Sequence, residues 1–505
     1  MTFLRAAAAL FALGLLMQVP DLARADVVRP VTRQDLSLLA KTVAGVAARY
    51  PMRTAQLGVA IVEARSGRRL LQWQAEHEFA PASNFKLLVG ASALAYLGQG
   101  FQYRTTLLAR GGISKGVLDG DLLLVGGGDP VLSRADLRQA AASVKAAGIQ
   151  KITGMVLVDG SIFDGQRYGP GWAWDDMPYY YQPPIQALAV DEGTVGVTVV
   201  PGAQPGATVS AALESDPGSM SLESDATTVA ARGLNDVDCF RSPGSLVIRI
   251  VGHLPLNEKS ATFRCTVEDS NADGAAIFSQ MLADKGITTG SAPRGRLPAN
   301  VALDISDESP APPPAAQRYP GATALWEHAS PTVADLLKRM MPPSDNFIAE
   351  HLFKMLPVAA FGRRGSFNGG AQVEQRFIAS LGLPPQSIDN GDGSGLSQGD
   401  RITPLALAET LRWETRNPAG PVFMQALAKA GINGTVRRHL RGTDAVGRVL
   451  AKDGYIWHVS TFSGYAYTKH HGLMIFSVMF NDANGSLRPF LQAEDIIVRT
   501  LVDLP

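Results

Sequence analysis

Residues 81–88 read Pro-Ala-Ser-Asn-Phe-Lys-Leu-Leu and open an apolar, helix-forming run that continues to about Leu97. Ser83 and Lys86 are three residues apart, so on a helix they share one face and the lysine amine can reach the serine hydroxyl. Such a hydroxyl is a poor nucleophile until a base removes its proton, and a lysine is a suitable base only where burial or positive charge lowers its pKa. We therefore expect Ser83 to be a nucleophile and Lys86 its base. A Ser-x-x-Lys match alone is a weak signal, because short motifs recur by chance.

Composition places the chain among ordinary globular proteins. It has 505 residues, of which 46% are hydrophobic and 18% charged, and its formal net charge is zero. This length is typical of two or three domains. There is no basic excess and no Arg/Lys-rich run to neutralise phosphates, so nucleic acid is not an expected partner.

The N-terminal 25 residues have the pattern of an export signal. Arg5 precedes an apolar core at 6–19, a small-x-small cleavage site follows at 23–25, and the mature chain is expected to begin at Asp26. The core is about fourteen residues long, shorter than the roughly twenty that a spanning helix needs, and no later run approaches that length. We therefore expect an exported protein without a transmembrane segment.

Cysteine and histidine usage bears on disulfides and metals. Cys239 and Cys265 are the only cysteines, and an oxidising compartment would permit a disulfide between them. Two cysteines cannot form a Cys₄ metal site, and the eight histidines contain no His-Glu-x-x-His arrangement. His470 and His471, beside Gly472 in an expected hairpin turn, are interpreted as solvated loop. No metal site is expected.

Periodicity and turn residues divide the rest of the chain into units. Two strands precede the Ser83 helix, an α/β region follows it, a β-rich module occupies the middle, and a proline linker precedes the last part. The expected elements are strands at 57–64, 69–73, 121–125, 154–159, 195–200 and 245–251, helices at 134–147 and 271–285, and the linker at 309–315.

An aromatic segment at 167–181 combines tryptophan and tyrosine with glycine and proline. It is expected to be a packed irregular loop. Such clusters can bind ligands, but support of the core is the favoured interpretation.

Ser344, Asp345 and Asn346 stand between two expected helices, at 330–341 and 347–356. In this position a Ser/Asp/Asn run is normally a helix cap. Beside a Ser83–Lys86 pair it has a second interpretation, because acyl transfer needs a hydroxyl to relay a proton and an amide to hold the substrate.

Taken together, these motifs resemble the penicillin-binding serine D-alanyl-D-alanine carboxypeptidase/endopeptidases, specifically the class C, penicillin-binding protein 4 type (peptidase family S13). The resemblance covers nearly all of the mature chain. The stretches that carry it are 81–86, 124–130, 168–181, 344–350, 392–397 and 463–465.

The resemblance implies roles for individual residues. Ser83 would attack the D-Ala-D-Ala or cross-link carbonyl, Lys86 would be the general base, and Ser344 with Asn346 would complete proton transfer and substrate binding. It also implies a periplasmic location, peptidoglycan stem peptides and cross-links as partners, β-lactams as covalent inhibitors, and no metal or organic cofactor.

The third motif of this family is Lys-Thr-Gly, and the matching place reads Lys452, Asp453, Gly454, Tyr455. Lys452 can still supply a positive field, and the backbone N–H groups of Ser83 and Tyr455 can still form an oxyanion hole. An anion at 453 would repel a substrate carboxylate or neutralise Lys452. Losing a charge-assisted hydrogen bond costs about 1.5–3 kcal/mol, roughly ten- to a hundred-fold in rate.

The expected fold class is α+β. A penicillin-binding (transpeptidase/β-lactamase-like) domain, with an antiparallel sheet flanked by helices, would be built from 26–107 and 315–505. An α/β domain would be inserted at 108–190 and 268–314, and a β-rich module at 191–267 would be nested within it.

Two functional hypotheses of different class remain open. The first is a serine peptidase that trims or cleaves peptidoglycan peptides, with its preference between carboxypeptidase and endopeptidase activity undecided. The second, motivated by Asp453, is a catalytically weak wall-binding or scaffold protein that retains the fold. A β-lactamase is a lesser alternative, against which the nested insert argues. The sequence predicts no oligomeric state.

Overall fold

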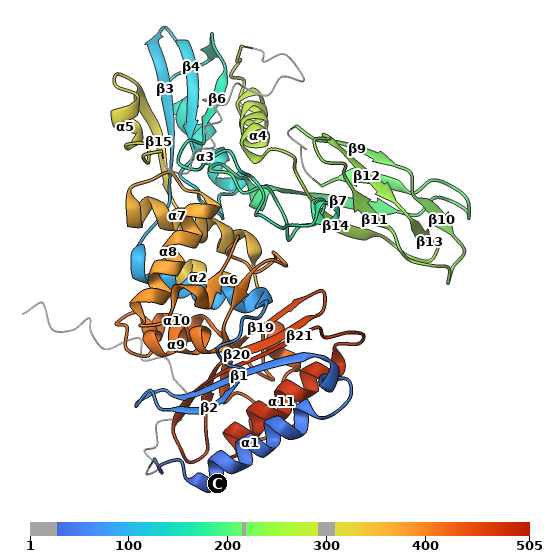
Figure 1. Ribbon diagram of the computed structural model, residues 1–505. Helices are drawn as coiled ribbons and strands as arrows, with labels where there is room; N and C mark the ends of the chain where they lie inside the picture. Colours follow the sequence, from blue (N-terminus) through green and yellow to red (C-terminus); the bar gives the residue numbers. More distant parts are fainter. Residues whose placement is uncertain (1–27, 215–218, 291–308) are drawn as a thin grey trace, which may run out of the picture.

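The computed structural model describes residues 28–214, 219–290 and 309–505. The expected signal peptide and the start at Asp26 lie outside these ranges. Figure 1 shows an elongated molecule, with a main domain at the bottom, an inserted α/β unit at the top and a nested β-rich module projecting to one side. None of the helices in the described ranges combines the length and apolarity of a membrane span.

The main domain is built on one six-stranded sheet, ordered β18-β19-β20-β21-β1-β2, in which all neighbours are antiparallel. Two of its strands come from the N-terminal part of the chain and four from the C-terminal part. The strands are β1 (Gln56–Glu63), β2 (Arg69–Trp73), β18 (Ala428–Lys429), β19 (Val449–Ile456), β20 (Val459–Tyr467) and β21 (Leu473–Asn481). The strands expected at 57–64 and 69–73 are confirmed.

Strand β1 is buried on both faces because each face packs against a different core. Leu57, Val59 and Ile61 belong to one hydrophobic cluster, and Ala60 and Val62 belong to another. Successive side chains of a strand point to opposite faces. The apolar run of β1 therefore predicts an interior strand with helices on both sides of the sheet, and the structure has β1 between β21 and β2.

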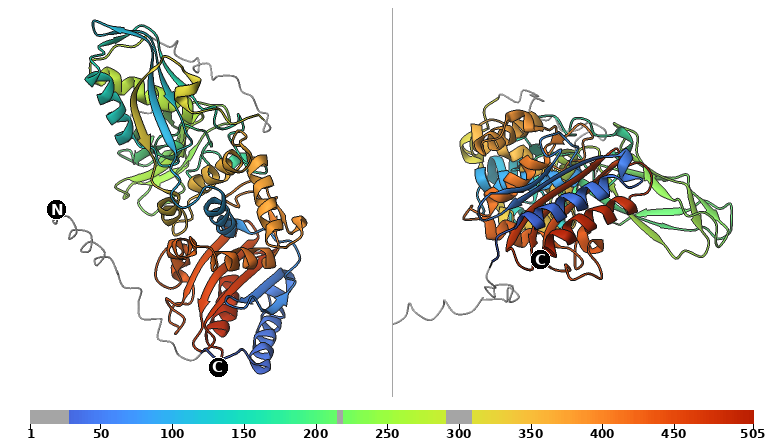
Figure 2. Two further views of the ribbon diagram at one scale, coloured as in Figure 1. Left: turned by 90° about the vertical axis from the view of Figure 1, so that its left-hand side faces the viewer. Right: turned by 60° about the horizontal axis from the view of Figure 1, so that its bottom comes forward.

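Helices cover the two faces of the sheet unequally. On one face, α1 (Arg33–Ala47) packs against α11 (Arg488–Val502), and Figure 2 shows them side by side beneath the strands. The other face is covered by a helical layer in which α9 contacts β1 and β21. The members of this layer are α2 (Phe85–Tyr96), α6 (Val333–Met340), α7 (Asn346–Phe361), α8 (Phe367–Ser380), α9 (Pro404–Glu414) and α10 (Gly420–Ala426).

The inserted unit has a five-stranded sheet ordered β15-β3-β4-β5, with β6 also paired to β4. The limit expected at residue 107 falls inside β3, and β15 lies beyond the limit expected at 314. Both strands belong to this sheet because β3 pairs with β4 on one side and with β15 on the other. The elements are β3 (Arg104–Ser114), β4 (Val117–Val125), β5 (Lys151–Ile152), β6 (Val156–Asp159), β15 (Thr323–Ala329), α3 (Arg134–Ala146), α4 (Ser270–Asp284) and α5 (Ala315–Arg318).

The nested module consists of small sheets ordered β14-β7-β8, β11-β12-β9 and β10-β13. Val195, Val197 and Val199 alternate along β7 and form its core with Ile248 and Ile250. Its strands are β7 (Thr194–Val200), β8 (Ser210–Leu213), β9 (Ser221–Ser224), β10 (Thr227–Val229), β11 (Asp238–Phe240), β12 (Val247–Val251), β13 (His253–Pro255) and β14 (Ala261–Thr266).

The two cysteines lie together in this core, but the structure holds them as free thiols. A hydrogen bond with Cys239 and burial raise the pKa of the Cys265 thiol. The disulfide that an oxidising compartment would permit is thus not formed in the structure, where the two cysteines share one core cluster.

The interpretation of His471 as solvated loop is wrong. Its side chain is buried, and its ring nitrogens lie 2.8 Å from the main-chain oxygens of Arg29 and Pro505. His471 therefore ties the first and last described segments of the main domain to the β20–β21 hairpin.

Candidate active site

Ser83 lies in a 3₁₀ turn, Ala82–Asn84, immediately before α2. Ala82 has a φ of 47°, a left-handed value that is costly for a residue with a side chain and that recurs at functional sites. Lys86 is in the first turn of α2, and its Nζ donates to Ser83 Oγ at 3.0 Å. The proximity expected from the spacing of these two residues is confirmed.

The Lys86 ammonium is fully buried and uses all three of its N–H groups. Besides Ser83 it donates to Asn346 Oδ1 at 2.7 Å and to the main-chain oxygen of Ser394 at 2.8 Å. Burial, followed by the positive charge of Lys452, lowers the pKa of Lys86 to about 7. A lysine with this pKa exists in appreciable neutral amount at physiological pH, as a general base requires.

The Ser344-Asp345-Asn346 segment combines the two interpretations that its sequence allowed. Asp345 caps α7 by accepting from the backbone N–H of Ile348 at 2.9 Å. Ser344, half-buried just before the cap, has a left-handed φ of 65°. Asn346 begins the helix and donates from Nδ2 to the main-chain oxygen of Tyr181 at 2.9 Å. The amide of Asn346 is thus held between Lys86 and Tyr181.

Gly454 allows strand β19 to approach the Ser83 turn. A Cβ at this position would lie 2.8 Å from Pro81 O and 2.8 Å from Ser83 N, closer than real Cβ atoms come to backbone. Thr461 on β20 donates to Pro81 O at 2.8 Å and fixes the same turn. Tyr455 follows on β19, with its side chain 60% exposed.

Lys452 and Asp453 form a local ion pair at the site. Lys452 Nζ, which is buried, lies 3.0 Å from Asp453 Oδ1 and also donates to Asp453 O at 2.6 Å. The Thr435 hydroxyl donates to the same carboxylate. Burial alone would raise the pKa of Asp453, but the Lys452 charge and the Thr435 hydrogen bond outweigh it and lower that pKa below its usual value. Asp453 is therefore ionised, and its carboxylate neutralises the positive charge of Lys452.

Sequence reasoning gave no role to two buried carboxyl groups that shape the loop at 391–397. Glu350 accepts from the backbone N–H groups of Gly393 at 2.9 Å and Ser394 at 2.8 Å. Asp392 accepts from the N–H groups of Gly395 and Ser397, both at 2.7 Å. These bonds direct the Ser394 carbonyl at Lys86. The glycine and serine repeats of this loop are the one sequence signal for such a main-chain cradle.

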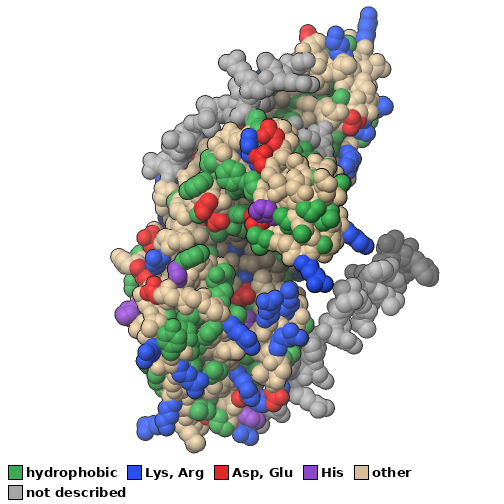
Figure 3. All heavy atoms as spheres, turned by 90° about the vertical axis from the view of Figure 1, so that its right-hand side faces the viewer, with side chains coloured by type: hydrophobic (Ala, Val, Ile, Leu, Met, Phe, Trp, Pro, Cys, Tyr) green, Lys and Arg blue, Asp and Glu red, His purple; other side chains and the backbone are tan. Residues whose placement is uncertain are grey.

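The aromatic segment does more than support the core. Its Tyr181 carbonyl holds Asn346, and its Trp172 indole donates to Asp392 Oδ2 at 2.7 Å. A cleft of about 870 Å³, lined by residues that include Asp345, Arg339 and Arg264, adjoins the Ser344-Asp345-Asn346 segment. Figure 3, viewed from the side of the nested module, shows this face hollowed between that module and the main domain.

Within the ranges that the structure describes, no group of three or more His, Cys, Asp or Glu side chains is placed to hold a metal ion.

The fold, with Ser83, Lys86 and Asn346 converging beside a lysine-bearing strand, defines the class of penicillin-binding serine peptidases. The model of the D-Ala-D-Ala carboxypeptidase 3 (S13) family matches residues 39–301 and 313–498, and the chain belongs to this family.

Known proteins support this assignment. A D-alanyl-D-alanine carboxypeptidase of Actinomadura sp. (strain R39) is 30% identical over 454 residues, which is 88% of this chain and 80% of that protein. The D-alanyl-D-alanine carboxypeptidase DacB of Haemophilus influenzae is 27% identical over 76% of each chain. The crystal structure of penicillin binding protein 4 (dacB) from H. influenzae has a TM-score of 0.79 at 24% identity, covering 91% of this chain and 99% of that one. This likeness establishes the fold and confirms the expected fold class.

Proposed function

We propose that the protein is a periplasmic serine D-Ala-D-Ala carboxypeptidase/endopeptidase, which cleaves peptidoglycan stem peptides or cross-links through an acyl-enzyme on Ser83. The observation that carries this proposal is the 3.0 Å contact of Ser83 Oγ with a buried lysine whose pKa is about 7. Membership of the S13 family and the names of the carboxypeptidase relatives support the substrate class.

In the acylation step, neutral Lys86 takes the proton of Ser83 while Oγ bonds to the carbonyl carbon of the scissile D-Ala peptide. The negative charge that forms on the carbonyl oxygen is held by the backbone N–H groups of Ser83 and Tyr455. Gly454 makes this arrangement possible by letting β19 lie against the Ser83 turn.

Collapse of the tetrahedral species breaks the C–N bond, and the departing amine takes up a proton. Lys86, now protonated, is the source, and Ser344 relays the proton to the amine. Asn346 keeps one N–H of Nδ2 free of Tyr181 O and donates it to the substrate amide. Water then hydrolyses the ester with Lys86 again as base, which releases the shortened peptide and restores Ser83.

Lys452 lowers the pKa of Lys86. It is also the only lysine on β19, and its ammonium can attract an anionic group of the substrate. Because Asp453 pairs with Lys452, a free terminal carboxylate must compete for that charge. We therefore expect discrimination against peptides that end in a free D-alanine carboxylate, relative to cross-links.

The proposal is tested by incubating the exported protein with penicillin and measuring intact mass. We expect one adduct per chain, on Ser83, and a mature N-terminus at Asp26. Ser83→Ala should abolish the adduct, whereas Ser92→Ala, a buried serine on the same helix, should keep it. An unlabelled wild-type protein, or labelling that persists in Ser83→Ala, would overturn the nucleophile assignment.

A further inference from the structure

A short stretch of the aromatic segment, residues 177–182, connects the catalytic amide with the nested module; we call it the tyrosine segment. Its Tyr181 carbonyl accepts from Asn346 Nδ2 at 2.9 Å, while Lys86 donates to Asn346 Oδ1 at 2.7 Å. Since an amide has its donor and acceptor at opposite ends, these two contacts fix which way Asn346 points. The position of one main-chain oxygen therefore sets the orientation of a side chain beside the nucleophile.

The tyrosine segment is internally rigid. Tyr179 N donates to Asp176 O at 3.0 Å, and Gln182 N donates to Tyr179 O at 2.9 Å, so two consecutive turns are closed by hydrogen bonds. The Tyr181 hydroxyl donates to Asp176 Oδ1 at 2.8 Å, and the rings of Tyr179 and Tyr181 stack with centroids 5.6 Å apart. The Tyr181 carbonyl therefore cannot move without the rest of the segment.

The other side of the segment is fastened to the nested module. Tyr179 forms an antiparallel bridge with Cys265 on β14, and its hydroxyl donates to Asp238 Oδ2 at 2.6 Å. Thr266 N donates to Pro178 O at 3.0 Å, and the Thr266 hydroxyl donates to Met177 O. The segment is thus paired with the edge of the module's sheet.

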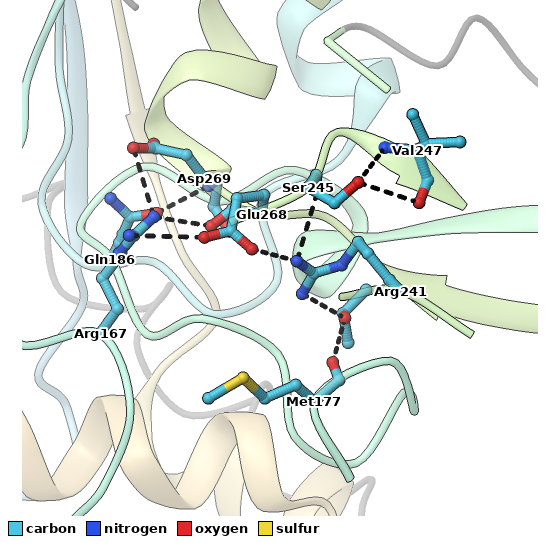
Figure 4. A network of polar contacts seen from close by, with 10 residues as sticks. Arg167, Met177, Gln186, Arg241, Ser245, Val247, Glu268 and Asp269 are labelled. Carbon is cyan, nitrogen blue, oxygen red and sulfur yellow. Dashed lines mark hydrogen bonds and ion pairs between the residues drawn. The ribbon is translucent and has the colours of Figure 1, made fainter. Parts of the chain in front are cut away.

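Thr266 is itself held by a buried ion pair at the base of the module. Arg241, 1% exposed, pairs with Glu268 and donates from Nη2 to Thr266 Oγ1 at 3.4 Å. Arg167 donates to the main-chain oxygen of Glu268 at 2.7 Å. Figure 4 shows this arrangement, with Arg241, Glu268 and Arg167 in one line and Met177 beneath Arg241. A buried charge that loses its partner carries a large desolvation penalty. The Arg241–Glu268 pair therefore holds these side chains in one arrangement.

We propose that the nested module positions the catalytic amide: Thr266, held by the Arg241–Glu268 pair, fixes the tyrosine segment, whose Tyr181 carbonyl orients Asn346 for catalysis. This inference rests on the proposed function. Thr266, Arg241 and Glu268 are positioning residues, since they act through Asn346 and do not touch the reacting atoms. The module's contribution to activity is then the alignment of a group in another domain.

The test is a double-mutant cycle read by the rate of penicillin acylation. Thr266→Val keeps the shape but removes the hydroxyl, and with it the bonds to Met177 O and from Arg241. Losing the one bond that reaches the tyrosine segment is worth about a fivefold change in rate. We expect Thr266→Val to slow acylation about fivefold in the wild-type background and less than twofold in the Asn346→Ala background, because Asn346 is then absent. Thr262→Val, an exposed threonine on the same strand, is the matched control and should change neither rate.

Equal losses in both backgrounds would assign Thr266 a merely structural role and overturn the inference, as would no loss in either. Failure of the wild-type protein to acylate would instead overturn the proposed function. If Thr266→Val does not fold, Tyr179→Phe takes its place in the cycle, because it removes the bond to Asp238 at the surface of the module. Tyr179→Phe should likewise slow acylation in the wild-type background and have a smaller effect in the Asn346→Ala background.

Discussion

Replacing Asp453 should redirect the enzyme towards substrates with a free carboxylate. In the structure Lys452 Nζ lies 3.0 Å from Asp453 Oδ1, and at an effective dielectric constant of about 20 two such charges attract by roughly 5–6 kcal/mol. That attraction is an upper limit, because a competing substrate carboxylate must also lose its water. The net value of a charge-assisted hydrogen bond, about 1.5–3 kcal/mol, sets the expected gain at roughly ten- to a hundred-fold.

The assay compares kcat/KM for a pentapeptide ending in D-Ala-D-Ala, the same peptide with an amidated C-terminus, and a cross-linked dimer. Asp453→Thr should raise the value for the free acid by the stated factor and leave the other two substrates nearly unchanged. Asp453→Asn is the matched variant, since it removes the charge at nearly constant size. It should give most of the same gain if charge is the cause.

Equal changes for the acid and the amide would refute the electrostatic reasoning, because no interaction specific to the carboxylate would then have been released. Unfolding midpoints of both variants should be recorded with the kinetics. A variant that loses stability but keeps the acid-to-amide ratio of the wild type would show that the Lys452–Asp453 pair serves the fold alone.

Three further predictions follow from the geometry of the site and of the sheet. The rate of penicillin acylation should rise with pH up to about 7 and then level off, since Lys86 must be neutral to act and its pKa is about 7; a flat profile from pH 5.5 to 8.5 would contradict this. Gly454→Ala should slow acylation at least a hundred-fold while the protein stays folded, because a Cβ would lie 2.8 Å from Ser83 N; unchanged labelling would show that β19 does not press on this turn. Burial raises the pKa of Glu494 to about 8, so the folded state holds a proton that the unfolded state has lost above about pH 4.3, and this group makes stability fall as pH rises towards 8. Glu494→Gln should therefore raise the melting temperature more at pH 8.5 than at pH 5, and a pH-independent effect would count against the raised pKa.

The parts of the fold that depend on local pattern were predictable from the sequence. The strand at 69–73 has the same bounds in the structure, and the contact of Ser83 with Lys86 follows from helical spacing alone. The limits of the inserted unit were not predictable in this way, because β15 joins β3 across more than two hundred residues and no local signal records that pairing. Helix α8 was also missed, since two of its first four residues are glycine, which disfavours helix.

The side chains of the candidate site could be predicted from the sequence, but the main-chain groups that hold them could not. The motifs indicate Ser83, Lys86 and Asn346, which the structure brings together. The main-chain carbonyls of Ser394 and Tyr181 fix Lys86 and Asn346. Because every residue has such a carbonyl, the sequence does not indicate which ones take part. The sequence left open whether an anion at 453 repels a substrate carboxylate or neutralises Lys452, and the ion pair of Asp453 with Lys452 favours neutralisation.

The pairing of β1 with β21 in the main sheet has a consequence for how the protein is made. Strand β1 pairs with β21, and Ala80 N, three residues before Ser83, donates to Asn481 Oδ1 over a separation of 401 residues. Contacts so distant along the chain form late, because the loop they close must first be ordered. A chain that has not yet been synthesised as far as β21 therefore lacks the strand that pairs with β1, however complete its inserted unit and nested module are. The surroundings of the Ser83 turn are therefore complete only once synthesis has passed Asn481.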